Sequence, residues 1–421
     1  MSELSYLEKL LDGAEVEWLS LGDISEKISS GGTPKTGVPE YYNGDIPWLR
    51  TQEVDFGDIW DTGVKITEVG VKDSSAKWIP ANCVIIAMYG ATVGKIGINK
   101  IPMTTNQACA NIALNSKMAD YKYVFHFLSS QYEYIKSLGS GSQTNINAGI
   151  VKKLLIPIPC PNNPEKSLAI QLEIVRILDK FTALTAELTA ELTAELTARK
   201  KQYNYYRDQL LSFDEREVAH FPMGQKDIGE FVRGGSLQKK DFTESGVGCI
   251  HYGQIFTHYG TFTDKTKTFV SESLAKKCRK AQSGNLVIAT TSENDDDVCK
   301  AVAWLGTNDI AISSDACIYK HKLNPKYVSY FFQTEQFQNQ KRQYITGTKV
   351  RRVNADNLAK ILIPVPSLQE QSRIVEILDK FETLTNSLTE GLPHEIELRQ
   401  KQYEYYRDLL FSFPKPESVT H

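Results

Sequence analysis

The pattern of hydrophobic positions is clearest in two segments that lie 200 residues apart. Ser167–Phe213 and Ser367–Phe413 align without a gap, with 27 identities in 47 positions. Both begin with apolar residues spaced three or four apart, which places them on one face of a helix. These stripes are Ile174, Ile177, Leu178, Phe181, Leu184 and Leu188, and Ile374, Ile377, Leu378, Phe381, Leu384 and Leu388. Because the stripes are narrow and have polar flanks, we expect each helix to pack against one partner helix.

The starts and the middles of the two copies differ. Ser367 and Glu370 form a capping-box pattern before the second helix, whereas the first copy has Ile170 instead of the glutamate, which predicts a weaker cap. The first copy then repeats Thr-Ala-Glu-Leu three times. Each repeat is close to one helical turn and adds ~6 Å, so the tract predicts a helical spacer that acts as a ruler. The second copy has Gly391–Pro393 here, which predicts a kink or break.

The duplication continues outside the helices. Short apolar runs such as Cys83–Ala87 and Leu286–Ala289 predict strands, and Tyr121–Tyr134 and Tyr327–Gln340 predict helices. The weaker matches pair Gly31-Gly32 with Gly234-Gly235, Gln52 with Gln254, Ile86-Ala87 with Ile288-Ala289, Tyr123-Val124 with Tyr327-Val328, and Leu154–Pro159 with Ile361–Pro366. The order is therefore domain, helix, domain, helix, with the helices nearly copied and the domains diverged.

This order predicts an α/β (α+β) fold with a pseudo-two-fold internal repeat. Two mixed α/β domains are expected on either side of two long antiparallel helices that form a coiled-coil spacer. The expected boundaries are 1–15 for an N-terminal segment, 16–159 for the first domain, 160–213 for the first helical spacer, 214–366 for the second domain, and 367–421 for the second spacer and tail.

Composition excludes several classes of protein. The chain has 421 residues with a net charge of −3, so it is not a polycation that binds nucleic acid through charge alone. The N-terminus has no secretion signal and no apolar run is long enough to cross a membrane, so we expect a cytoplasmic protein. Seven scattered cysteines without a C-x-x-C pattern indicate reduced thiols and no metal site.

The signatures of catalysis are missing as well. Gly90–Ile96 approaches a phosphate-binding loop but is one residue short and lacks the hydroxyl that binds Mg²⁺. Asn163–Glu165 lacks the second proline and the aromatic residue of an adenine methyltransferase motif. Asp295–Asp297 is interpreted as a solvated turn in preference to a metal site. We therefore predict no catalytic residue and no metal ligand in this chain.

Polar loops in both domains carry residue types that suit DNA recognition. Arg and Lys suit guanine, Asn and Gln suit adenine, and hydroxyl and basic side chains suit phosphate. The candidates are Thr33, Lys35, Arg50, Gln52, Tyr89, Asn106, Gln107, Ser142 and Gln143 in the first domain, and Lys239, Lys240, His251, Tyr252, Gln254, Lys349, Arg351 and Arg352 in the second. Residues 217–366 carry 20 positive and 15 negative side chains, whereas residues 15–159 carry 13 and 14, so charge favours DNA binding only in the second domain.

Both helical segments end in Lys-Gln-Tyr-x-Tyr-Tyr-Arg-Asp. The side chains considered for partner binding are Tyr203, Tyr206 and Arg207 and their copies Tyr403, Tyr406 and Arg407. Two interpretations stay open. These residues are either buried against the scaffold or form an aromatic platform for a partner subunit, because Tyr and Arg are favoured at interface centres.

These features together resemble the specificity subunit of Type I restriction–modification enzymes. The resemblance covers essentially the whole chain and rests on the duplicated IV-x-ILDKF and KQY-x-YYRD segments, the I-P-[IV]-P strand ends, Gly-Gly-Thr-Pro with Ile46-Pro47-Trp48, and the Thr-Ala-Glu-Leu tract. It implies two target-recognition domains that each bind one half of a split sequence in double-stranded DNA. It also implies two methyltransferase subunits and two restriction/translocase subunits as partners. S-adenosylmethionine, ATP and Mg²⁺ would be held by those partners, and no cofactor by this chain.

The resemblance also places Pro34, Trp48 and Gln52 near DNA in the first domain. In the second domain Leu237 replaces the proline and Ile250 is aligned with Trp48, so its target is expected to differ. A rival interpretation is a structural adaptor whose helix pair spaces two protein-binding domains. An enzyme that acts alone is a third alternative, which the missing catalytic motifs disfavour.

Overall fold

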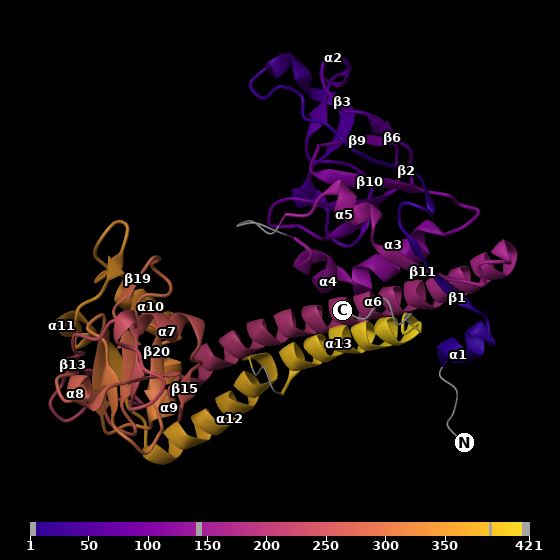
Figure 1. The fold of residues 1–421 in the computed structure, drawn as a ribbon. Coiled ribbons are helices and arrows are strands. Elements are labelled where there is room, and N and C mark those ends of the chain that lie inside the picture. Colours follow the sequence, from indigo (N-terminus) through magenta and orange to yellow (C-terminus); the bar gives the residue numbers. More distant parts are fainter. Residues whose placement is uncertain (1–5, 140–144, 387–389, 415–421) are drawn as a thin grey trace. The chain divides into compact units, whose positions relative to one another are not determined.

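The computed structural model describes residues 6–139, 145–386 and 390–414 (Figure 1). The chain forms two compact units, one of Met1–Thr189 with Leu398–His421 and the other of Ala190–Glu397. Each unit holds one mixed α/β domain together with parts of the long helices.

The described residues of the first unit form three sheets. The largest has the strand order β2 (Ser25–Ser30), β10 (Cys109–Leu114), β7 (Val84–Ala87), β8 (Ile96–Asn99) and β4 (Asp58–Ile59). The next has the order β5 (Lys65–Ile66), β3 (Tyr42–Leu49), β9 (Met103–Thr105) and β6 (Trp78–Ile79), and β1 (Val16–Ser20) pairs with β11 (Leu155–Pro159). Every residue of β7 and β8 is buried, which explains the continuous apolar run that predicted β7.

The second unit repeats this topology strand for strand. Its large sheet has the order β13 (Gly229–Arg233), β22 (Ala316–His321), β18 (Leu286–Ala289), β20 (Ala301–Trp304) and β15 (Phe262–Thr263). The others are β16 (Thr268–Val270), β14 (Val247–Ile250), β21 (Ile310–Ile312) and β17 (Lys280–Ala281), and β12 (His220–Pro222) with β24 (Leu362–Pro364). The parallel pairs also match, since β3–β9 and β4–β8 correspond to β14–β21 and β15–β20. One further pair, β19 (Thr291–Ser292) with β23 (Arg351–Arg352), is described only in the second unit.

Short helices and 3-10 turns connect the strands. In the first unit they are α1 (Tyr6–Leu11), η1 (Pro39–Tyr41), η2 (Thr51–Glu53), α2 (Glu68–Lys72), α3 (Tyr121–Ser130), α4 (Tyr132–Ser137) and α5 (Ala148–Lys152). In the second they are η3 (Lys239–Asp241), α7 (Tyr252–Thr257), α8 (Glu272–Ala275), α9 (Pro325–Phe331), α10 (Glu335–Arg342) and α11 (Ala355–Leu358). The predicted helices Tyr121–Tyr134 and Tyr327–Gln340 are thus each divided in two. In the second unit the division occurs because the Thr334 hydroxyl caps a new helix by accepting the Phe337 N–H at 3.2 Å.

A long helical segment follows each domain. Helix α6 (Pro164–Leu210) is continuous over 47 residues and contains the whole Thr-Ala-Glu-Leu tract. The second copy is broken into α12 (Leu368–Asn386) and α13 (Leu392–Leu410), as Gly391–Pro393 predicts. Gly391 has φ +88°, and a Cβ there would lie 2.5 Å from the Thr383 carbonyl oxygen, so only glycine lets the chain pass this close to α12.

The predicted start of the first helix at Ser167 was wrong. Helix α6 begins at Pro164, before Ser167, and the Asn163 side chain caps it by accepting the Lys166 N–H at 3.0 Å. In the second copy the Ser367 hydroxyl accepts the Glu370 N–H at 3.2 Å, while the Glu370 carboxylate pairs with Arg373.

The expectation that each apolar stripe packs on one partner helix was also wrong for its first half. Ile174 and Leu178 lie in the core of the first domain, and Ile374 and Leu378 lie in the core of the second. The next turn packs on the other long helix: Phe181 stacks on Tyr406 at 5.3 Å between ring centroids in the first unit, and Phe381 packs on Tyr206 at 5.8 Å in the second. Leu184, farther along, is 51% exposed.

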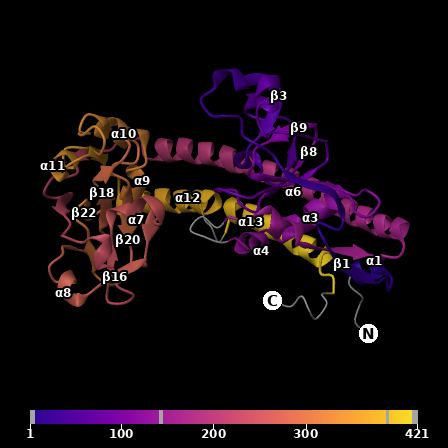
Figure 2. The ribbon, with the colours of Figure 1, turned by 45° about the horizontal axis from the view of Figure 1, so that its top comes forward.

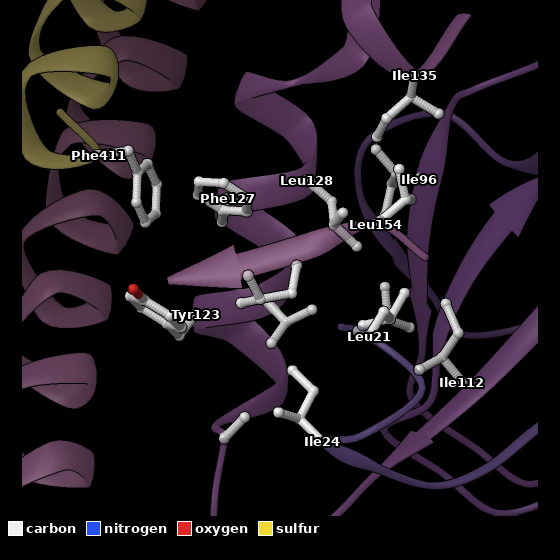
Figure 3. Close-up of a cluster of buried hydrophobic side chains, with 14 of the residues drawn as sticks. Leu21, Ile24, Ile96, Ile112, Tyr123, Phe127, Leu128, Ile135, Leu154 and Phe411 are labelled. Atoms are coloured by element: carbon white, nitrogen blue, oxygen red, sulfur yellow. The ribbon is translucent and has the colours of Figure 1, made fainter. Parts of the chain in front are cut away.

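The end of the chain completes the core of the first unit. Phe411, just after α13, packs edge-on against Tyr123 and Phe127 of α3, with ring centroids 5.7 and 5.4 Å away (Figure 3). The first part of α6 and the last part of α13 run side by side here (Figures 1 and 2), and the Thr182 hydroxyl donates to the Tyr403 hydroxyl at 3.2 Å. In the second unit, Leu211 at the end of α6 is buried in the corresponding way.

Candidate nucleic-acid interface

Backbone hydrogen bonds bring the candidate loops of each domain together. In the first unit four N–H groups donate to carbonyls at 2.8–3.0 Å: Gly32 to Thr105, Asn106 to Leu49, Met88 to Ala108, and Ile146 to Met88. The second unit has four equivalent bonds at 2.8–3.2 Å: Gly235 to Ile312, Ser313 to Ile250, Thr290 to Asp315, and Val353 to Thr290. We call each set of four bonds the loop junction. The same junction therefore gathers loops of different sequence in the two domains.

The first loop junction presents several of the predicted side chains together. Thr33, Lys35, Gln52, Tyr89 and Gln107 are exposed, and the Thr33 hydroxyl donates to the Gln107 side-chain oxygen. Arg50 and Asn106 are partly buried, and the Arg50 guanidinium pairs with Glu53 at 3.3 Å. Ser142 and Gln143 lie outside the described residues. Seven of the nine first-domain candidates are thus described, and all seven lie on or beside the joined loops.

Trp48 supports this junction from inside. Its indole N–H donates to the Gly32 carbonyl at 2.9 Å, and the side chain is buried. Pro34 is also buried, and its carbonyl accepts the Tyr42 hydroxyl at 2.7 Å. These contacts fix the Gly-Gly-Thr-Pro loop, so Trp48 and Pro34 position their neighbours.

The structure corrects the sequence alignment of the two domains by one residue. Strand pairing places Leu49 opposite Thr105 and Ile250 opposite Ile312, so Leu49 corresponds to Ile250. The counterpart of Trp48 is therefore Cys249, and Gln254 corresponds to Glu53 instead of Gln52. Sequence matching placed Gln52 on Gln254 because both are glutamines, although the surrounding strands are shifted by one position.

His251 and Gln254 are buried, with 8% and 9% of their surfaces exposed. The Gly253 N–H donates to His251 Nδ1 at 3.2 Å, and the His251 N–H donates to Gln254 Oε1 at 2.9 Å. These two reciprocal bonds cap the N-terminus of α7. The Gln254 amide donates to the Thr268 hydroxyl at 3.0 Å. Burial, assisted by the charge of Lys239, lowers the pKa of His251, so its ring is neutral near pH 7. These two side chains therefore bond within the protein, whereas Lys239 and Lys240 are exposed and Tyr252 is partly so.

The predicted basic cluster lies on a hairpin at the second loop junction. Arg351 and Arg352 form β23, which pairs with β19, and Lys349 is exposed at the turn before it. Arg351 Nε pairs with Asp295 at 2.8 Å, and its Nη1 donates to the Gly347 carbonyl at 2.5 Å. The sequence predicts only a solvated turn at Asp295, whereas in the structure its carboxylate pairs with Arg351. A sequence cannot show it, because 56 positions separate the two residues.

The repeated tyrosines divide between scaffold and surface. Tyr203 and Arg207 are buried in the second unit, where the Tyr203 hydroxyl donates to Gln333 at 3.1 Å. Tyr403 and Arg407 are partly buried in the first unit, and Arg407 pairs with Asp408 at 2.8 Å.

The neighbouring aromatic rings are open to solvent. Tyr206 and Tyr406 keep part of their rings exposed, while Tyr205 and Tyr405 are 61% and 64% exposed. Tyr205 and Tyr405 were not among the predicted partner-binding residues, because they lie off the helix face that carries the other tyrosines. The repetition of a tyrosine at this position in both copies could have indicated them.

Equivalent polar contacts fasten each long helix to its domain. Lys122 pairs with Asp179 at 2.6 Å, and Lys326 pairs with Asp379 at 2.7 Å. Gln171 and Gln371 each accept an N–H at the start of the adjoining domain helix, at 2.9 and 2.8 Å. The hydrogen bond from His126, followed by that from Lys122, holds the pKa of Asp179 below its usual value. These contacts hold each domain on its long helix and involve none of the candidate loop residues.

Within residues 6–139, 145–386 and 390–414 no group of three or more acidic, histidine or cysteine side chains is arranged to hold a metal ion. Among the same residues, no helix combines the length and the apolar character needed to span a membrane.

Comparison with known proteins gives consistent matches over nearly the whole chain. The family model described as "Type I restriction modification DNA specificity domain" matches residues 14–198 and 222–398. The chain is 40% identical to the Type I restriction enzyme EcoR124I/EcoR124II specificity subunit of Escherichia coli, with 100% of both chains covered. It is 36% identical to the EcoprrI specificity subunit of the same species, with 93% of both covered.

Solved structures show the same fold. A chain from work on the structural basis of complex assembly and conformational transition of the type I R-M system superposes with a TM-score of 0.67 at 16% identity, covering 94% of this chain and 97% of that one. The HsdS subunit from Thermoanaerobacter tengcongensis gives a TM-score of 0.51 at 15% identity, covering 94% and 95%.

Proposed function

The chain belongs to the Type I restriction modification DNA specificity family, and we propose that it binds a bipartite DNA sequence through its two domains and assembles the restriction–modification complex around its helices. Proteins of this kind select the DNA target and carry no enzymatic activity of their own. The chain accordingly belongs to a restriction system as its specificity subunit.

One observation supports the proposal most strongly. The same four-bond loop junction occurs in both domains, yet the side chains on it differ. A shared frame with different polar side chains suits two recognition sites for different half-sequences, because the side chains that contact base edges carry the sequence preference and the frame holds them in place.

The side chains proposed for DNA contact follow from their exposure. In the first domain these are Thr33, Lys35, Gln52, Tyr89 and Gln107, with Arg50 and Asn106 behind them. In the second domain they are Lys239, Lys240, Tyr252, Lys349, Arg351 and Arg352, with His251 and Gln254 shaping the loop from within. The pairing of Thr33 with Gln107 supports a joint contact from two loops.

The proposed partners are two methyltransferase and two restriction/translocase subunits in addition to double-stranded DNA, acting in the cytoplasm. S-adenosylmethionine, ATP and Mg²⁺ would be bound by those subunits. The exposed rings of Tyr205, Tyr206, Tyr405 and Tyr406 support a docking role for the helix ends, because aromatic side chains are favoured at interface centres.

The test is to co-express the chain with the methyltransferase subunits and to map methylated adenines by single-molecule sequencing. We expect methylation at one sequence with two fixed halves and an unread spacer. Filter binding on random duplexes, with and without the methyltransferase, provides the second measurement. If the complex assembles but neither binds nor methylates DNA with sequence preference, the adaptor interpretation replaces this one.

A further inference from the structure

Lys341 is a fully buried lysine that is not among the residues proposed to contact DNA. It lies at the end of α10, and its ammonium group donates to the carbonyls of Asp295, Asp296 and Val298 at 2.8, 3.1 and 2.9 Å. A buried charge is costly unless its hydrogen-bonding groups are satisfied, and an ammonium has three N–H donors. Here all three carbonyl acceptors come from one loop, so the lysine fixes the path of residues 295–298.

The helix that carries Lys341 is itself held firmly. Phe337 lies one turn earlier on α10, is fully buried, and packs on Phe332 at 4.2 Å and on Phe331 at 5.8 Å between ring centroids. The loop therefore rests on the core of the second domain, since its own Val298 also belongs to that core.

The same loop orients Arg351. Asp295 pairs with Arg351 Nε, and the Gly347 carbonyl accepts from Nη1, so two of the three guanidinium nitrogens are held. The Arg351 side chain is still 33% exposed, and that of Asp295 is 54% exposed. Backbone pairing of Ser292 with Arg351 keeps the loop and the hairpin in register.

We propose that Lys341 is a positioning residue for Arg351, and that the chain Lys341–Asp295–Arg351 sets the base preference in the half-site of the second domain. This inference rests on the proposed function. An arginine held in place can donate to both acceptors of guanine, and a side chain that is already ordered loses less conformational entropy on binding. Lys341 acts from inside the protein and does not contact the DNA.

The first domain holds the corresponding turn by a different contact. Its turn between β7 and β8 is shorter than the turn between β18 and β20, and a Cβ at Gly94 would lie 3.4 Å from the ring of Tyr132 on α4. The turn there packs on an aromatic ring where the second domain uses an ammonium group. Disturbing Lys341 should therefore affect one half-site only.

The test uses the chain co-expressed with its methyltransferase subunits and maps the methylated sites. The variants are Arg351→Ala, Asp295→Ala, Lys341→Met and the double variant Asp295→Ala/Lys341→Met. We expect each to raise methylation at sites mismatched in the second half by about tenfold, the value of one good base contact. Sites that are mismatched in the first half of the target should stay unmethylated. The double variant should methylate mismatched second-half sites no more than the less specific of the two single variants, because both changes break the same chain of contacts.

Glu230→Ala is the matched control, because it breaks the Glu230–Lys320 ion pair of 2.8 Å in the same domain, and its target should stay unchanged. If Lys341→Met fails to assemble, Lys341→Arg takes its place, because it keeps the buried charge but cannot place one ammonium group among the three carbonyls. The inference is overturned if Arg351→Ala relaxes the second half while Asp295→Ala or the Lys341 variant keeps it, or if both halves relax together. The proposed function fails separately, if the unaltered complex shows no sequence preference.

Discussion

At the scale of single residues, burial determines which polar groups are available for recognition. His251 and Gln254 are used inside the protein, whereas Thr33 and Gln107 bond to each other at an exposed position. Burial also affects groups far from the loops. His321, at the end of β22, packs on Tyr319 with tilted rings whose centroids are 4.9 Å apart, and burial lowers its pKa to about 4.

The buried histidine predicts an acid-sensitive second unit. The folded chain keeps His321 neutral, whereas the unfolded chain binds a proton below about pH 6.5, so acidification from about 6.5 to about 4 should cost roughly 3 kcal/mol of unfolding free energy. Below pH 4 the ring is protonated in the folded chain as well, so His321 should cause no further loss of unfolding free energy. His321→Phe should remove it, as measured by denaturant unfolding of the second unit at pH 7 and pH 4.5. The exposed His258→Phe is the control; an equal effect of both changes would contradict the assignment.

At the scale of elements, the two long helical segments differ in continuity. Helix α6 runs unbroken through the Thr-Ala-Glu-Leu tract, in which Leu188, Leu192 and Leu196 are all half-buried on nearly one face. Helices α12 and α13 are separated at Gly391, so only the first copy offers an uninterrupted ruler.

Deletion of Thr193–Leu196 shortens α6 by ~6 Å, close to one helical turn, and leaves every loop residue in place. We expect the mapped methylation target to keep both half-sites and to change the number of unread base pairs between them. Thr197→Ala keeps the length and should leave the target unchanged. A deletion variant with an altered half-site and the original spacer would contradict the ruler.

The helices and the repeat could be predicted from the sequence because local periodicity and capping encode them. The partner of the apolar stripe could not, because Ile174 and Leu178 have the same spacing whether they pack on a helix or on a domain. The register between Leu49 and Ile250 was missed by one position, since it depends on strand pairing and not on local pattern. The Asp295–Arg351 pair was missed for the same reason: it joins residues that are distant in sequence.

At the scale of the whole molecule, two domains of one topology carry different surfaces. The charged side chains in residues 15–159 nearly balance, whereas residues 217–366 have an excess of five positive charges. Phosphate contacts from Lys and Arg make binding sensitive to salt. We therefore expect DNA binding by the second domain to depend more strongly on salt than DNA binding by the first.

Replacing Val16–Pro159 with the corresponding domain of another specificity subunit should change one half of the methylated sequence and leave the other half and the spacing intact. The reason is that the loop junction of each domain is formed within its own unit. Methylation mapping gives the measurement, with the unaltered chain as the reference. Changes in both halves would show that the domains do not recognise DNA independently.

The packing of Phe411 on Tyr123, together with the 2.8 Å hydrogen bond from the Trp18 indole to the Pro414 carbonyl, has a consequence for biosynthesis. The core of the first unit joins residues that are far apart in the order of synthesis, whereas Ala190–Glu397 is a single stretch. A chain truncated before Phe411 would therefore contain every residue of this stretch and lack part of the core of the first unit.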